Sequence, residues 1–347
     1  MCDSALFSKA EEQNFSSAAR YFIQQTPLVR SSAIYAPALC AAKQGTESFR
    51  CILKQFYPEK LQSHTEADAY GVFGLKASSE FFSPEWRNLH SLFLRELELN
   101  GEILARRTDI PSVFPISSLH GRSDLYVIHS EDSIALDDFA AMRRPQTLTD
   151  DYLALCLSIT DHLLHSVAAI HEVCLHLNIT PKTVYITPGG CPPEHLTVSS
   201  AFSVSLLDLS AARKREELRL PCAGFSLYLN GTYTRGYSDT YLRDALTMSS
   251  CFSETDDYLI KYPIDERSDL FSIAAVAYFL ITGYSPRTDC ETFSALLPSE
   301  GPLLDPLLRQ QLEDLLSAAL RLSSGYAQAE SALSEFAEEL YTIQQQL

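Results

Sequence analysis

The feature that most constrains the fold is a nearly uncharged apolar run from Leu270 to Tyr284, which follows the charged sequence Asp-Glu-Arg-Ser-Asp at 265–269. A helix that spans a bilayer needs about 20 apolar residues, and this run is shorter and contains Ser272 and Thr282. A helix that is apolar on all sides is buried in a protein core. The sequence therefore predicts a buried core helix here, and no membrane insertion.

The composition indicates a chain that buries a large core. Apolar residues make up 46% of the 347 residues, which argues against wholesale disorder. The length corresponds to about two domains or to one large two-lobed unit. With 27 basic and 44 acidic residues, the formal net charge is −17. Such a chain lacks the basic face that nucleic acid or anionic lipid requires. We therefore expect no nucleic acid and a basic protein partner, with solubility as the alternative reason for the charge.

The cysteines and the N-terminus indicate a cytoplasmic protein. The chain has nine cysteines but no C-x-x-C motif and no zinc-finger spacing, which is typical of reduced, buried thiols. The sequence MCDSALFSKAEEQNFSS at the N-terminus has no apolar segment of the kind found in a cleaved signal peptide. The alternative is secretion into a host cell, as an effector, by a route that needs no such segment.

The periodicity of the sequence changes from strand-like to helical along the chain. Around 28–60, side chains alternate in the period of a pleated strand, as they do from Phe49 to Lys54. After about residue 149, almost every long segment has a helical period; these segments are 150–172, 268–284, 303–323 and 326–346. The sequence predicts an α+β protein in which a small strand-rich half precedes a larger helix-rich half.

Three segments lack a sustained period. Residues 1–27 are expected to form a polar helix or arm. It either serves in partner binding or secretion, or it packs on the strand-rich half or is frayed. The segment 187–195 and the segment from about 213 to 257 have the composition of loops. Loops of such length inside a compact domain are usually functional or disordered.

Two charged residues stand where charges are unusual. Glu96 lies three or four residues from Leu92, Phe93 and Leu99, so it shares the apolar face of the helix predicted for 84–105. An inward carboxylate needs a cation, and Lys54 on the preceding strand is the candidate. The alternatives are a half-exposed glutamate at the edge of the apolar stripe and a lysine on a solvated strand edge.

Several segments, taken in chain order, resemble the motifs of the protein kinase family, and bacterial eukaryotic-like Ser/Thr kinases most closely. RCILK (50–54) resembles the strand with the phosphate-binding lysine, and Glu96 matches its helical partner. HSEDSIALDDF (129–139) resembles the hinge, and HLNITPKTV (176–184) the catalytic loop. DLSAAR (208–213) resembles D-F-G-x-A-R, and DERSDLFSIAAVAYFLITG (265–283) the aspartate-headed central helix. The resemblance covers about residues 28–345.

The resemblance implies a bilobal fold with a small β-rich N-lobe and a larger helical C-lobe. The implied boundaries are an arm at 1–27, the N-lobe at 28–132 and the C-lobe at 133–347. In the family, the aspartate that corresponds to Asp269 bonds the backbone of the catalytic loop, so its presence here argues for an intact fold.

The catalytic loop departs from the family at the positions that carry the chemistry. His176 matches the family's histidine, but Leu177 replaces the arginine that follows it. Asn178 stands where an aspartate accepts the substrate proton, and an amide cannot serve as a general base. Thr183 replaces the asparagine that binds magnesium. These residues form a degenerate catalytic loop without a catalytic residue.

The nucleotide-binding positions are altered as well. The region 30–43, where the phosphate-binding loop is expected, contains no glycine, so close backbone approach to a phosphate is disfavoured. The resemblance places Ile52 and Tyr185 at the small residues around the adenine pocket, where their bulk is expected to fill it. The contrary interpretation is that the lobes open slightly and a nucleotide still fits.

Lys54, Glu96 and Asp208 survive, and they allow two interpretations. Either they retain vestigial ATP and magnesium binding, or Lys54 and Glu96 tie helix to sheet while Asp208 caps a turn or pairs with Lys54. We favour the structural interpretation. His162 and His165 have a spacing that metal ligands use, but no third ligand is apparent, so we expect no metal and no cofactor.

The sequence therefore predicts a catalytically inactive pseudokinase that acts as a protein-binding scaffold or allosteric regulator in signalling. By analogy with the bacterial kinases that it resembles, we expect a bacterial effector or regulator. One alternative is a kinase-fold enzyme with non-standard nucleotide chemistry, such as AMP transfer. The other is a divergent but active Ser/Thr kinase in which another acid replaces the missing base.

Overall fold

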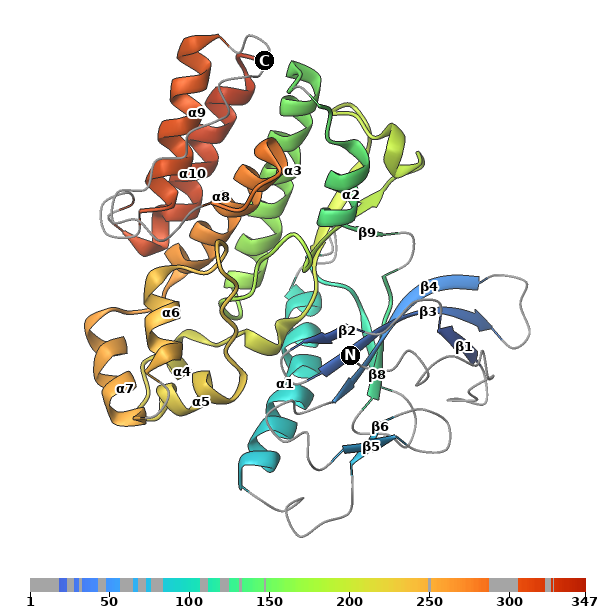
Figure 1. Cartoon of the computed structure of the whole chain (residues 1–347), viewed down its shortest axis with the longest axis vertical. Coiled ribbons are helices and arrows are strands. Elements are labelled where there is room, and N and C mark those ends of the chain that lie inside the picture. Colours follow the sequence, from blue (N-terminus) through green and yellow to red (C-terminus); the bar gives the residue numbers. More distant parts are fainter. Residues whose placement is uncertain are drawn as a thin grey trace. The chain divides into compact units, whose positions relative to one another are not determined.

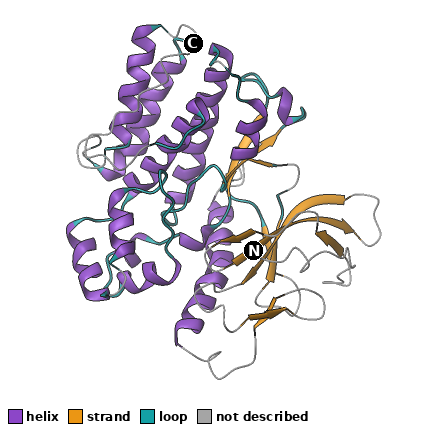
Figure 2. Cartoon of the chain, in the orientation of Figure 1, coloured by secondary structure: helices purple, strands orange, loops and turns teal. Residues whose placement is uncertain are grey.

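The computed structural model describes residues 19–23, 28–30, 33–42, 48–56, 65–67, 73–75, 84–106, 112–118, 125–130, 133–146, 148–248, 251–286, 305–321, 326 and 328–347. The contacts divide the chain into two compact units (Figures 1 and 2). Unit 1 takes the described residues of Met1–Glu102 and Phe114–Asp132, and unit 2 those of Ile103–Val113 and Ser133–Leu347. The boundaries expected from the sequence, at 1–27, 28–132 and 133–347, stay a prediction.

Unit 1 is built on a six-stranded sheet in which all neighbours pair antiparallel. The order is β1-β3-β4-β8-β7, and β2 also pairs with β3. The strands are β1 (Ala19–Ile23), β2 (Leu28–Arg30), β3 (Ala33–Ala42), β4 (Ser48–Phe56), β7 (Ile116–Ser118) and β8 (Leu125–Ile128). A separate pair is formed by β5 (Thr65–Ala67) and β6 (Phe73–Leu75), and the long helix α1 covers Pro84–Arg106.

The pairing refines two expectations about the start of the chain. Strand β1 lies inside the range expected to form an arm, and it pairs with β3 from Ala19 opposite Ala42 to Ile23 opposite Ala38. The rest of 1–27 lies outside the described residues. In the region 30–43, most residues form the single strand β3, and Arg30 pairs with Ala33. Residues 31, 32 and 43 lie outside the described residues.

Unit 2 is mostly helical. Its small sheet has the order β11-β10-β9, from β9 (Ile134–Ala135), β10 (Val184–Pro188) and β11 (Phe202–Leu206). Its helices include α2 (Leu136–Arg143), α3 (Asp150–His171), α8 (Glu266–Thr282), α9 (Pro306–Ala319) and α10 (Ala329–Gln344). Helix α3 contacts both α8 and α10, and α8 also contacts α9 and α10. Unit 2 therefore packs around α8.

Helix α8 is the predicted core helix, and it is buried along almost its whole length. Asp265 caps its N-terminus by accepting from the backbone N–H of Arg267 at 3.0 Å. It ends at Gly283, whose φ of +80° favours glycine.

Helix α3 is long and apolar enough to span a membrane by composition, but 67% of its most apolar window is buried inside the structure, as expected of a core helix.

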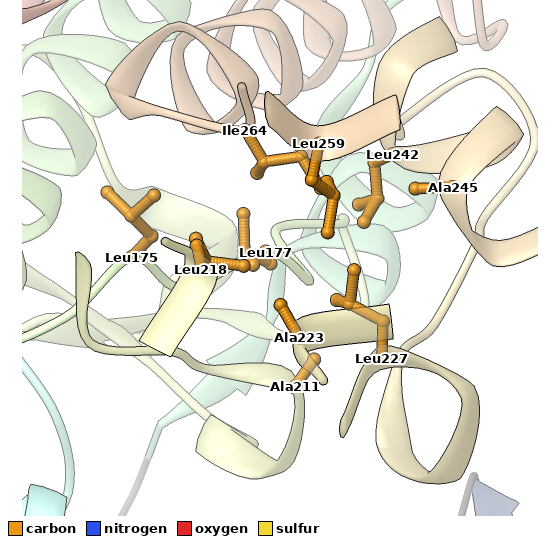
Figure 3. Close-up of a cluster of buried hydrophobic side chains, with 10 residues drawn as sticks. All are labelled: Leu175, Leu177, Ala211, Leu218, Ala223, Leu227, Leu242, Ala245, Leu259 and Ile264. Carbon is orange, nitrogen blue, oxygen red and sulfur yellow. The ribbon is translucent and has the colours of Figure 1, made fainter. Parts of the chain in front are cut away.

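The segment from about 213 to 257, expected to be a loop, is mostly helical, so that prediction is wrong. It contains α4 (Arg215–Leu218), α5 (Ala223–Asn230), α6 (Thr240–Thr247) and the start of α7 (Phe252–Lys261). Each helix contributes only one or two side chains to a shared apolar cluster (Figure 3), whose members are Leu175, Leu177, Ala211, Leu218, Ala223, Leu227, Leu242, Ala245, Leu259 and Ile264. Because each short helix contributes so few apolar residues, the sequence of this segment shows no sustained helical period.

We expect Leu227→Ala to destabilise unit 2, because Leu227 is 1% exposed in the middle of this cluster and its truncation leaves a cavity. The expected cost is about 2–5 kcal/mol of unfolding free energy, measured by urea denaturation. Leu220→Ala is the matched control, because Leu220 lies in the same segment and is 58% exposed. Equal effects of the two substitutions would contradict a core in this segment.

Candidate functional site

In unit 1, the expected pair of Lys54 and Glu96 is present and buried. Lys54 on β4 is 0% exposed and Glu96 on α1 is 1% exposed, and the lysine Nζ donates to Glu96 Oε2. The hydroxyl of Tyr126 donates to the same oxygen at 2.5 Å. The structure therefore excludes both alternatives, a half-exposed glutamate and a lysine on a solvated strand edge.

Strand pairing and helix periodicity together explain this geometry. Lys54 lies directly opposite Tyr126 on β8, so both side chains emerge on the same face of the sheet. On α1, Leu89, Phe93 and Leu99 are buried with Glu96 on one stripe. The ring of Phe93 lies 4.7 Å from that of Tyr126, centroid to centroid. Sequence reasoning missed Tyr126, because only the register of β4 with β8 reveals it.

In unit 2, Asp269 holds the loop that resembles a catalytic loop. Its carboxylate accepts from the backbone N–H of His176 at 2.7 Å and of Leu177 at 2.8 Å, and it bonds His171 Nε2 at 2.9 Å. Leu177 has a φ of +57°, a left-handed conformation that costs about 1–2 kcal/mol for a residue with a side chain. Asp269 therefore stabilises a strained turn at the start of the loop.

A kinase site has an acidic residue at each of two positions. This chain has Asn178 at one of them and Asp208 at the other, and the amide and the carboxylate form a hydrogen bond. Asn178 Nδ2 donates to Asp208 Oδ2 at 3.1 Å. Asp208 is 2% exposed, has a φ of +71° and caps the short turn Leu209–Ala211 by accepting from the backbone N–H of Ser210. Two carboxylates at this distance would repel each other, whereas the neutral amide satisfies the aspartate.

Thr183 points into the loop and uses its hydroxyl there. Its Oγ1 donates to the carbonyl oxygen of Asn178 at 2.7 Å and accepts from the backbone N–H of Thr180 at 2.9 Å. The residue is only 2% exposed. The hydroxyl thus closes the turn from 178 to 183 instead of facing outward as a metal ligand.

His176 is buried beside this turn. Its Nδ1 accepts from the backbone N–H of Asn178 at 3.3 Å. Burial lowers the pKa of His176, although the charges of Asp269 and Asp208 oppose this shift. A neutral histidine that accepts a backbone hydrogen bond has a structural role.

Arg213 is a residue that sequence reasoning did not single out. It is 1% exposed, and its guanidinium donates to the carbonyl oxygens of Ala212 at 2.8 Å and Ser226 at 2.9 Å. Its backbone pairs with that of Leu175. Arg213 therefore anchors the start of the segment 208–257 to α5 and to Leu175, just before the catalytic-like loop.

Ile52 lies in unit 1 and Tyr185 in unit 2. Ile52 on β4 is 6% exposed and pairs with Ile128 of β8. Tyr185 on β10 is half-buried and pairs with Ser205 and Ala135, between the buried Val184 and Ile186. Their filling of one adenine pocket stays a prediction.

Among the residues that the structure describes, no three or more His, Cys, Asp or Glu side chains gather as a metal site would require. His162 Nδ1 and His165 Nδ1 each bond the backbone oxygen of the residue four positions earlier, at 2.9 and 2.8 Å. Both histidines are thus engaged within α3.

Comparison with known proteins relates this chain to kinase domains by fold. No family model and no curated protein matches the sequence. The chain is similar to the crystal structure of the PknI kinase domain from Mycobacterium tuberculosis, with a TM-score of 0.50 at 17% identity over 96% of this chain and 99% of that one. The crystal structure of a double mutant of that kinase domain also gives a TM-score of 0.50 at 17% identity, over 95% of this chain and 98% of that one. The chain has a protein-kinase-like α+β fold.

We expect the buried pair in unit 1 to show strong coupling. Lys54→Met leaves Glu96 without its cation and should cost about 3–5 kcal/mol of unfolding free energy. Adding Glu96→Met should recover part of that loss, because no unpaired charge then remains. Denaturant unfolding of the two single variants and the double variant measures the coupling. Glu98→Met, at an exposed position of the same helix, is the control, and strictly additive losses would contradict the pairing.

We expect the contribution of Asp269 to depend on pH. Burial alone would raise the pKa of Asp269, but the hydrogen bond and charge of His171, with His176 beside it, hold the pKa below its ordinary value. The stabilisation is therefore complete above an unfolded-state value of about 3.9 and is lost as the pH falls through the folded-state value.

Asp269→Asn should accordingly cost about 1.5–3 kcal/mol near neutral pH, and its deficit relative to wild type should shrink below about pH 4. Urea denaturation across this range measures both quantities. Asp257→Asn, at an exposed position on α7, should change neither. A deficit that stays constant down to acid pH would show that the charge of Asp269 is not what stabilises the loop.

Proposed function

We propose that this protein is a pseudokinase, a kinase-like fold that binds a protein partner as a scaffold or allosteric regulator and does not transfer phosphate. The observation that carries the proposal is the hydrogen bond from Asn178 to Asp208, 3.1 Å long. In phosphoryl transfer, a carboxylate accepts the substrate proton and carboxylate and amide oxygens hold magnesium. An amide that donates to the neighbouring aspartate does neither.

The loop is complete without a metal ion. In an arrangement of two carboxylates, a cation relieves their mutual repulsion. Here the amide of Asn178 takes that role for Asp208, and the hydroxyl of Thr183 is used within the turn. This favours a site whose stability does not depend on magnesium or ATP, so no cofactor is part of the proposal.

The retained Lys54 and Glu96 fit a structural role in the same way. They neutralise each other in the interior of unit 1, and Tyr126 satisfies a further lone pair of the glutamate. Removing one partner of such a pair is costly, so a structural role alone would account for the presence of both residues. The folded segment 208–257, with its own apolar cluster, also favours a fixed binding surface.

We propose that the partner is a protein of basic character, because the formal net charge of the chain is −17 and opposite charge speeds and orients association. The proposed setting is the cytoplasm of a bacterium or, after secretion as an effector, of a host cell.

The second candidate function is a kinase-fold enzyme with altered nucleotide chemistry, such as AMP transfer, which the intact Lys54–Glu96 pair favours.

Nucleotide binding separates the two candidates. With millimolar ATP and Mg²⁺ or Mn²⁺, we expect no rise in the unfolding temperature and no transfer of phosphate or AMP to the chain or to a generic substrate. Transfer that is abolished by Lys54→Ala would overturn the pseudokinase proposal and establish an enzyme.

A charge substitution tests the role of Asn178 directly. Asn178→Asp places a second carboxylate against Asp208 and should lower the unfolding temperature in EDTA, with partial recovery in millimolar Mg²⁺. Asn230→Asp is the control, because Asn230 is also buried and donates to a carbonyl oxygen, that of Ser210. The fall in unfolding temperature that Asn230→Asp causes should not be reversed by Mg²⁺. An Asn178→Asp protein as stable in EDTA as wild type would contradict the proposed role.

A further inference from the structure

Unit 2 contains a groove that is separate from the loop around Asn178 and Asp208. Its volume is about 1080 Å³, and its walls come from α3, α4, the connection from α7 to α8, and α10. Surveyed pockets for small ligands run from about 300 to 1,000 Å³. This groove is therefore large for a single small metabolite.

The floor of the groove is apolar. Leu218, Leu259 and Ile264 belong to the buried cluster of Figure 3, and their edge lines the groove together with Leu333 of α10. At the rim stands Ile260, which is 79% exposed. An isoleucine this exposed beside an apolar floor forms a continuous surface that is suited to apolar side chains of a partner.

Two charges of opposite sign remain at the rim. Arg219 lies at the end of α4 and Glu330 on α10, and both are exposed. Within the described part of the chain, neither side chain forms a hydrogen bond or ion pair. The other charges at the rim are engaged: Glu266 accepts from Arg215 at 2.6 Å, and Asp265 from Arg267.

We propose that this groove binds an amphipathic helix of the partner protein. The apolar stripe of the helix would lie on the floor, with an acidic residue facing Arg219 and a basic residue facing Glu330. A fatty acid or another anionic amphiphile would match Arg219 but would be repelled by Glu330, whereas a peptide carries both charges. The proposal deepens the binding function proposed above and rests on it.

The test uses a display library of helical peptides of about 16 residues, a little over four turns, selected against the full chain. The selected peptides should carry apolar residues at i, i+3, i+4 and i+7, with an acidic residue on one flank and a basic residue on the other. Leu333→Arg and Ile260→Asp should each weaken binding by about tenfold or more. Leu307→Asp on α9 is the matched control, because Leu307 is 65% exposed and does not line the groove.

A charge reversal at the rim keeps the test independent of folding. Arg219→Glu changes an exposed side chain and should weaken binding of a selected peptide, and exchanging the peptide's acidic residue for lysine should restore it. The unfolding temperature of each variant checks that the chain is intact. Absence of any selected peptide, or affinities that ignore Leu333→Arg and Arg219→Glu, would overturn the proposal.

Two further outcomes are decisive. Binding of sodium oleate that is lost in Leu333→Arg and strengthened in Glu330→Gln, without peptide selection, would make the groove a lipid site and overturn the peptide proposal. Phosphate transfer by a chain that still binds the peptide here would overturn the pseudokinase proposal and leave the groove assignment standing. The failures of the two proposals are thus distinguishable.

Discussion

The carboxylate of Asp269 is the interaction on which the arrangement of unit 2 depends. It lies in the first turn of the buried helix α8 and receives two backbone N–H groups and His171. Helix α8 packs against α3, α9 and α10, and the loop that the carboxylate binds takes the strained conformation of Leu177. The positions of Asn178 and Thr183, and so the contact with Asp208, follow from that loop.

In each unit, residues that match kinase motifs bond other groups of the same unit. In unit 1, Lys54 and Glu96 neutralise each other and Tyr126 adds a hydrogen bond. In unit 2, Asn178 donates to Asp208, and Thr183 closes its own turn. In kinase chemistry the lysine–glutamate pair is also present, whereas the carboxylate that corresponds to Asp208 holds magnesium. Here Asp208 accepts a hydrogen bond from Asn178 instead, which is why a kinase-like fold and the proposed loss of phosphate transfer are compatible.

The segment that follows Asp208 folds into short helices in its described part. Arg213 anchors its start, and short helices pack their few apolar residues into one cluster. The outer edge of that cluster is the floor of the groove beside α10. A segment that in kinases serves the reaction therefore contributes, in the proposed function, to a surface for a partner.

The sequence by itself determined the core helix 268–284, the place of Glu96 on an apolar helix face with Lys54 as its candidate cation, the kinase-like order of the motifs and the substitutions at Asn178 and Thr183. Local periodicity or residue identity indicates each of these features. Only the tertiary structure decided the burial of Lys54, the part of Tyr126, the inward turn of the Thr183 hydroxyl, the role of Arg213 and the helices within 213–257. These features depend on contacts between residues far apart in the chain or on helices too short to leave a period. A hydrogen bond forms only between atoms a few ångströms apart, and a side chain is buried only by the residues that the fold places around it. A local sequence pattern therefore cannot specify these contacts.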